Sequence, residues 1–129
     1  MVHIDLIDGL ATRDVAVDFI AKNTNADGII STKPFIIHHA KACGLLTVQR
    51  FFLLDSLSLN NIYKISSLEA ADAIEILPGV MPKIIKKLVK SLQKPLIAGG
   101  MIIDKEDIIG ALDAGAIAIS STNQNTWLM

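Results

Sequence analysis

The strongest constraint on the fold is a regular alternation of short apolar runs, rich in β-branched residues, with longer helix-like segments. Such runs recur about 23 residues apart, which is the length of a strand, a short helix and two loops. They lie at Val2–Leu6, Asp27–Ser31, Leu45–Gln49, Ala73–Leu77, Pro95–Ala98 and Ala116–Ser120. Because they lack in–out alternation, they indicate parallel strands buried on both faces and joined by right-handed crossovers. The chain is therefore expected to be an α/β protein.

Helix signals stand between these runs. Pro34 and Pro82 occur where a first helical turn is expected, and Gly44 and Gly115 occur where helices should end. The predicted helices cover 12–22, 32–44, 54–72, 78–92 and 104–116. With 129 residues, 51% of them hydrophobic, and no low-complexity linker, the chain suits one domain, residues 1–129, with a substantial core.

Six parallel strands fit either an open doubly wound sheet or part of a (β/α)₈ barrel, which typically takes about 200–250 residues. The last two predicted strands favour the barrel, because they end in "IAGG" and "AISSTN". Barrels that bind phosphate commonly do so in the loops after strands 7 and 8. We therefore predict a partial TIM-type (β/α) barrel that has six parallel strands and lacks about two N-terminal βα units.

Composition and isolated polar residues exclude several classes of protein. A net charge of −1 gives no overall electrostatic attraction to nucleic acid or to an anionic membrane, and the apolar run 95–103 is too short to span a bilayer.

The lone Cys43 cannot form an internal disulfide, and we expect it to be a small core residue. His38 and His39 point about 100° apart on a helix, so we predict one packed and one exposed histidine, and no metal site. No signal peptide is recognisable, which predicts a cytoplasmic protein.

A phosphate site is predicted from the ends of the last two strands. Gly99 and Gly100 would let backbone N–H groups approach an anion closely, and Ser120 and Ser121 would add hydroxyl donors at the neighbouring strand end. A tight βα turn is the alternative for the glycines taken alone. Their combination with the serines one unit later favours phosphate.

Charged residues at other strand ends extend this site. Ligands of parallel α/β folds lie at the carboxyl ends of the strands, where Asp5, Lys33, Arg50 and Glu75 are expected. Lys33 and Arg50 could neutralise a phosphate, while Asp5 and Glu75 could accept hydrogen bonds from hydroxyl groups. A polyol phosphate suits this mixture. The alternative is a rim ion pair such as Asp5 with Lys33.

A basic helix face is also predicted. Lys83, Lys86, Lys87 and Lys90 fall at helical spacing on one side of the segment 78–92, opposite its aliphatic residues. A solvated face and a contact with RNA phosphates are both compatible with this pattern.

Several blocks of the chain resemble the glycerol-3-phosphate responsive antiterminator family. They are "VHIDLIDGLATRDVAVDFI", "DGIISTKPFIIHHAKACGLLTVQRFFLLDS", "IEILPGVMPKII", "PLIAGGMI" and "AGAIAISSTNQNTWLM", which together cover essentially the whole chain. The resemblance implies a (β/α) barrel that binds glycerol 3-phosphate as effector and acts on the leader mRNA of glycerol-utilisation operons to prevent premature transcription termination. It implies neither catalysis nor a cofactor, in keeping with the lack of a nucleophile beside a base.

Family members carry about two further βα units before the "HIDLIDG" block. An unclosed sheet would expose a parallel edge, which predicts a partner or a homo-oligomer. The competing hypothesis is a phosphate-binding barrel enzyme, an isomerase or synthase acting on a glycerol or sugar phosphate. In that enzyme Asp5 or Glu75 would be the general base and Lys33 an electrophile.

Overall fold

Six parallel strands in sequential order form the sheet of the computed structural model, which describes residues 1–66 and 70–129. The strands are β1 (Val2–His3), β2 (Gly28–Ser31), β3 (Leu46–Phe52), β4 (Ala73–Leu77), β5 (Leu96–Gly99) and β6 (Ala118–Ser120). Each predicted strand is present, and β4 has the predicted bounds. The first is shorter than predicted, because the chain turns after His3 into a 3₁₀ helix, η1 (Ile4–Leu6), that buries Ile4.

One α-helix lies between each strand and the next, as the sequence predicts. They are α1 (Asp14–Asn23), α2 (Pro34–Ala42), α3 (Ser56–Ser66), α4 (Pro82–Ser91) and α5 (Lys105–Asp113), and a 3₁₀ helix, η2 (Gln124–Leu128), ends the chain. Of the predicted helix 54–72, residues 67–69 lie outside the described residues. None of the described helices has the length and apolar character needed to cross a bilayer.

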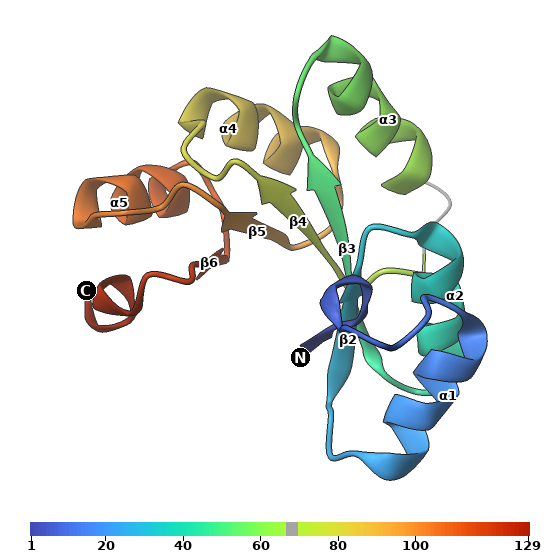
Figure 1. The fold of residues 1–129 in the computed structure, drawn as a ribbon. Coiled ribbons are helices and arrows are strands. Elements are labelled where there is room, and N and C mark those ends of the chain that lie inside the picture. Colours follow the sequence, from blue (N-terminus) through green and yellow to red (C-terminus); the bar gives the residue numbers. More distant parts are fainter. Residues whose placement is uncertain (67–69) are drawn as a thin grey trace.

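The strand order selects the barrel over the doubly wound sheet. A doubly wound sheet reverses its strand order at a switch point, which sends helices to both faces. Here the order runs from β1 to β6 without reversal, so crossovers of one hand place every helix on the same side. The result is a curled half-barrel with helices on the convex side (Figure 1). In the described chain β1 and β6 each pair with one neighbour, and the expected homo-oligomer stays a prediction.

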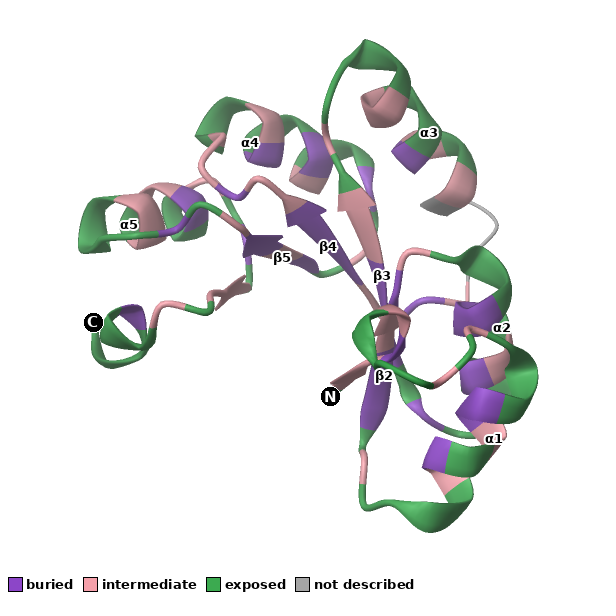
Figure 2. Ribbon diagram, in the orientation of Figure 1, coloured by how far each residue is buried: buried purple, intermediate pink, exposed green. Residues whose placement is uncertain are grey.

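The hydrophobic core lies between the convex side of the sheet and the helices, whose buried faces turn toward the strands (Figure 2). It falls into two clusters. One packs under α3, α4 and α5 and contains Ile62, Ile74, Ile76, Ile85, Leu88, Leu92, Leu96, Ala98, Ala111 and Ala116. The other packs under α1 and α2 and contains Ile4, Ala16, Val17, Ile20, Ile29, Ile36, Ala40 and Leu45. The helix layer thus fixes which strand residues face the opposite, concave side.

The charged side chains of β3 and β4, Arg50 and Glu75, lie on that concave side. Ile74 and Ile76 of β4 belong to the helix-facing core, so Glu75 between them points inward. Arg50 pairs with Glu75 across the sheet, and Gly99 pairs with Ser120, so each pair shares a face. The sheet register therefore gathers charged and hydroxyl groups inside the curl, toward the carboxyl ends of the strands.

Candidate functional site

A cavity of about 250 Å³ opens at the carboxyl ends of β4, β5 and β6. Its lining comes from strand ends and from the loops that follow β5 and β6: Arg50, Glu75, Leu77, Gly100, Met101, Ile102, Ile103, Ser120, Ser121, Thr122 and Asn123. Five of the eight residues predicted for the phosphate and its rim line this cavity. The structure brings these five residues together, and ligand binding by them stays a prediction.

A buried ion pair lies at the base of the cavity. Arg50 Nε donates to Glu75 Oε2 at 2.7 Å, and the exposed fractions of the two side chains are 15% and 1%. A carboxylate this deeply buried needs a charged partner, because removing its hydration costs several kcal/mol. The other oxygen, Glu75 Oε1, is buried without a hydrogen-bond partner, and the terminal Nη groups of Arg50 bond to no residue in the described chain. The pair thus leaves one acceptor and two donor groups unused.

The double glycine serves the wall of this cavity in two ways. A Cβ on Gly99 would lie 2.7 Å from Glu75 Oε1, so bare backbone at this position makes room for the buried carboxylate. Gly100 has a φ of 75°, which L residues rarely adopt, and it turns the chain into the loop lining the cavity. Met101 follows with a φ of 61°. The glycines therefore combine the tight turn and the close approach that the sequence left as alternatives, and the group that approaches Gly99 is a carboxylate of the protein itself.

The two predicted serines have different surroundings. Ser121 ties the two cavity loops together, because its hydroxyl donates to Ile102 O at 3.2 Å and accepts from Asn123 N–H at 3.1 Å. Ser120 lies opposite Gly99, and its hydroxyl makes no hydrogen bond to the described residues. Ser120 is thus the free hydroxyl of the pair, and Ser121 shapes the loop.

Asp5 and Lys33 lie at the strand ends but outside the cavity. Asp5 accepts hydrogen bonds from the Ser31 hydroxyl at 2.7 Å, Thr32 N–H at 2.7 Å and the Thr32 hydroxyl at 3.0 Å. Burial raises the pKa of Asp5, but these three bonds outweigh burial and hold the pKa below its ordinary value. Lys33 is exposed, and no ion pair joins it to Asp5 within the described chain. The alternative of an Asp5–Lys33 ion pair is therefore not found among the described residues, and Asp5 instead binds the turn at Ser31 and Thr32.

His3, the last residue of β1, lies close enough to the charged groups of the interior to feel their electrostatic effect. Its Nδ1 is buried without a partner. Burial and the positive charge of Arg50 hold the pKa of His3 below its ordinary value, although the carboxylates of Asp5 and Glu75 oppose them. A neutral imidazole beside the Arg50–Glu75 pair is the consequence at neutral pH.

The arrangement does not suit the enzyme hypothesis. Glu75, proposed as a general base, is held in a salt bridge, and both oxygens of Asp5 already accept hydrogen bonds. Lys33, the proposed electrophile, does not line the cavity that holds Glu75. These three side chains therefore lack the shared geometry that a base and an electrophile need around one substrate.

The basic face is present on the outside of the half-barrel. Lys83, Lys86, Lys87 and Lys90 are exposed along α4, while Ile85 and Leu88 are buried beneath it. The helix starts at the strand ends that form the cavity and runs away from them, so the lysines form a separate surface.

Sequence reasoning missed a polar cluster between the first two helices. Cys43 is exposed and its thiol contacts Asp18 Oδ1 at 3.5 Å, so the prediction of a core cysteine is wrong. The buried stripe of α2 ends at Ala40, since the helix stops at Ala42 and Cys43 caps it beyond the sheet. His39 is half-buried and His38 exposed, as expected. The spacing of four residues from His39 to Cys43 was the available signal.

Comparison with known proteins gives consistent matches. A sequence model of a family described as "Glycerol-3-phosphate responsive antiterminator" matches residues 1–127. The "Uncharacterized protein YgcP" of Escherichia coli strain K12 is 41% identical over 128 residues, which cover 99% of this chain and 67% of that protein.

Two crystal structures share both sequence and fold with the chain. A glycerol uptake operon antiterminator regulatory protein from Listeria monocytogenes superposes with a TM-score of 0.93 at 37% identity, covering 98% of this chain and 68% of that one. A glycerol uptake operon antiterminator-related protein from Thermotoga maritima gives 0.84 at 32% identity, with 98% and 72% covered. The chain spans about two thirds of the length of these relatives.

Proposed function

The chain belongs to the glycerol-3-phosphate responsive antiterminator family, and from this premise we propose that its cavity binds glycerol 3-phosphate and that its basic helix contacts leader mRNA. The family is one of regulators and not of enzymes. The proposed activity takes glycerol 3-phosphate as effector and needs no cofactor. An RNA target places the activity in the cytoplasm.

The observation that carries the effector proposal is the chemistry of the 250 Å³ cavity. Pockets for drug-sized ligands measure about 300–1,000 Å³, so this cavity suits a smaller metabolite. The Arg50 Nη groups offer charge-assisted donors for a phosphate, and the Ser120 hydroxyl and the backbone after Gly100 lie along the same wall. Glu75, with an unused oxygen, supplies an acceptor for a ligand hydroxyl. This donor and acceptor set fits a polyol phosphate.

Calorimetric titration with glycerol 3-phosphate tests this assignment. Ser120→Ala removes a hydroxyl that bonds to no described residue, so the fold should be unaffected. A hydrogen bond to a charged group contributes about 1.5–3 kcal/mol, which predicts affinity weakened about tenfold or more. Ser91→Ala on α4 is the matched control and should bind normally. Unchanged binding by the Ser120→Ala variant would place the effector elsewhere.

The RNA proposal rests on the four exposed lysines of α4. Between Lys83 and Lys90 they extend over about 10 Å of helix, since each residue rises 1.5 Å. Lysine–phosphate contacts release counterions, so RNA affinity should fall with salt. Because the chain's overall charge is −1, electrostatic attraction to RNA requires a local basic surface such as this one.

A hydrogen bond connects the effector cavity to this helix. Gly79, in the loop between β4 and α4, donates its N–H to Gly100 O at 3.0 Å. A Cβ on Gly79 would lie 2.9 Å from Gly99 N, so the loop before α4 also touches the end of β5. We propose that effector binding at Gly100 acts through this contact on the start of α4. Effector and RNA would then strengthen each other's binding by the same factor.

Titration of leader mRNA at several salt concentrations, with and without glycerol 3-phosphate, tests the coupling. Each lost contact to single-stranded RNA reduces the salt slope by about 0.7, so Lys86→Gln/Lys87→Gln should reduce it by about 1.4. Lys22→Gln/Lys105→Gln removes equal charge from α1 and α5 and is the control. Equal effects of the two double variants would remove α4 as the contact, and identical RNA affinity with and without effector would remove the coupling.

A further inference from the structure

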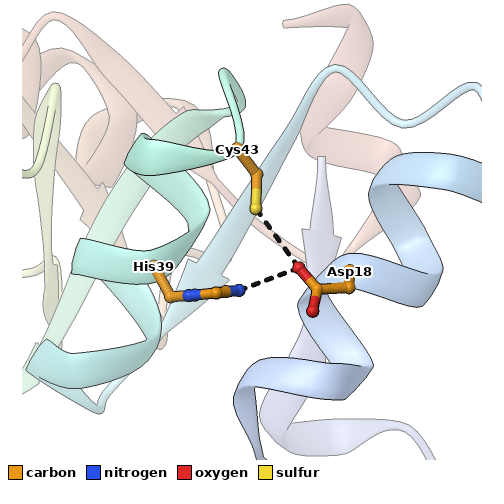
Figure 3. A group of neighbouring side chains, drawn as sticks. All are labelled: Asp18, His39 and Cys43. Atoms are coloured by element: carbon orange, nitrogen blue, oxygen red, sulfur yellow. Dashed lines mark hydrogen bonds and ion pairs between the residues drawn. The ribbon is translucent and has the colours of Figure 1, made fainter.

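We propose that a divalent transition-metal ion of the Zn²⁺ class binds between α1 and α2, with Asp18, His39 and Cys43 as its ligands. One carboxylate oxygen, one imidazole nitrogen and the thiol sulfur all lie within 4.8 Å of one another (Figure 3). Asp18 comes from α1, while His39 and Cys43 come from α2 and its C-cap. The cluster lies in the helix layer, apart from the cavity at the strand ends.

Helix geometry presents these side chains to one another. Asp14 and Asp18 stand four residues apart on α1, and His39 and Cys43 stand four residues apart along α2, so each pair shares a helix face. α1 and α2 pack against each other through a buried cluster that contains Val17, Ile36 and Ala40. This packing brings the Asp14–Asp18 face of α1 next to the His39–Cys43 face of α2. The ligands are thus placed by the hydrophobic contact between the helices.

The distances fit a tetrahedral ion after a small adjustment. Usual zinc–ligand lengths put a nitrogen and an oxygen ligand about 3.4 Å apart, and a sulfur and an oxygen ligand about 3.6 Å apart. Here His39 Nε2 lies 2.8 Å and Cys43 Sγ lies 3.5 Å from Asp18 Oδ1. The nitrogen–oxygen gap has to open by about 0.6 Å, and the nitrogen and sulfur atoms, which lie within 4.8 Å of each other, have to stand about 3.6 Å apart. The side chains of His39 and Asp18 are 30% and 39% exposed, so they can rotate by that amount.

The donor set selects the class of ion. Thiolate and imidazole are preferred by Zn²⁺ and similar transition metals, whereas Mg²⁺ and Ca²⁺ take oxygen ligands. Three protein ligands leave a fourth position for water. Asp14 Oδ2 lies 3.9 Å from His39 Nδ1, on the other side of the ring, where a carboxylate orients a metal-bound histidine.

The same contacts argue against a free reactive cysteine. The Cys43 thiol is exposed, but its contact with the Asp18 carboxylate places it beside a negative charge, which disfavours the thiolate that a reactive cysteine needs. A bound divalent ion reverses this balance: the sulfur–metal bond forms, and the thiol proton leaves to solvent. The charged groups around the Cys43 thiol are Lys22, one turn after Asp18, and the carboxylates of Asp14 and Asp18.

Titration of the full chain with Zn²⁺ and with Co²⁺ tests the site. We expect one ion per chain, competition between the two metals, and a thiolate-to-cobalt charge-transfer band, since the chain has a single cysteine. Bound Zn²⁺ should also slow alkylation of Cys43. Binding weaker than millimolar, or a cobalt complex without the thiolate band, would overturn the proposal.

Variants assign the ligands. Removing a residue that merely supports a ligand weakens metal binding about 10–100-fold, so His39→Gln and Cys43→Ser should each weaken it at least that much. Asp14→Asn should have a smaller effect. His38→Gln, the exposed neighbour on the same helix, is the matched control and should bind Zn²⁺ normally. Wild-type affinity in the His39→Gln or the Cys43→Ser variant, with circular dichroism showing an intact fold, would refute the assignment.

Discussion

Replacing Gly99 with alanine isolates the steric requirement at the base of the effector cavity. Gly99 has no positive φ, so alanine meets no backbone strain there. The added Cβ would lie 2.7 Å from Glu75 Oε1, whereas ordinary contact begins at 3.4 Å. Glu75 must therefore retreat by about 0.7 Å, and its 1% exposure shows that it cannot swing into solvent.

The size of that retreat sets the expected penalty. Because β4 lies between β5 and β3, this retreat pushes Glu75 toward Arg50, which already lies at 2.7 Å, so the Arg50 side chain must shift with it and the ion pair is strained without being broken. The cost should then be that of overpacking, about 1–3 kcal/mol, and not the about 3–5 kcal/mol of a stranded buried charge. We expect a lower urea midpoint with an unchanged slope.

Two comparisons make this reasoning refutable. Gly110→Ala places its Cβ 3.5 Å from Pro82 Cγ inside α5, where alanine should stabilise the chain by up to about 1 kcal/mol. Glu75→Asp shortens the buried side chain, so the penalty of Gly99→Ala should shrink in that background. A Gly99→Ala variant as stable as the wild type, or an equal penalty in both backgrounds, would show that the contact with Glu75 is not the reason for glycine.

Two further predictions concern charged groups of the interior. Arg50→Met leaves the buried Glu75 carboxylate without its charged partner and should lower the free energy of unfolding, measured in urea, by about 3 kcal/mol. The double variant Arg50→Met/Glu75→Leu removes both charges and should recover most of this loss. Equal losses in both variants would contradict a buried ion pair. Burial raises the pKa of Asp5, but hydrogen bonds from Thr32 and Ser31 hold it below the ordinary value, so its contribution is present above about pH 4 and lost as pH falls through the folded pKa. Asp5→Asn should therefore lose less stability than the wild type between about pH 5 and pH 2 in thermal unfolding, and parallel pH curves would contradict this.

The secondary structure could be predicted from the sequence because it depends on local periodicity. Continuous β-branched runs mark the strands, and β4 begins and ends where its run does. Pro34 and Pro82 mark the first residues of α2 and α4. The glycine pair Gly99–Gly100 and the serine pair Ser120–Ser121 also predicted the position of the cavity. They could do so because the carboxyl ends of neighbouring parallel strands lie at the same edge of a sheet.

The tertiary structure alone decided which of these polar groups meet. Arg50 and Glu75 are 25 residues apart, and only the register of β3 against β4 joins them. The pairing of β4 with β5 brings Gly99 close to Glu75, where the missing Cβ leaves space for the carboxylate. The 3₁₀ turn of η1 directs Asp5 toward Ser31 and Thr32, outside the cavity. No local pattern encodes such pairings, because they depend on strand register, sheet curvature and helix packing, which arise when residues far apart in the chain bury their apolar faces together.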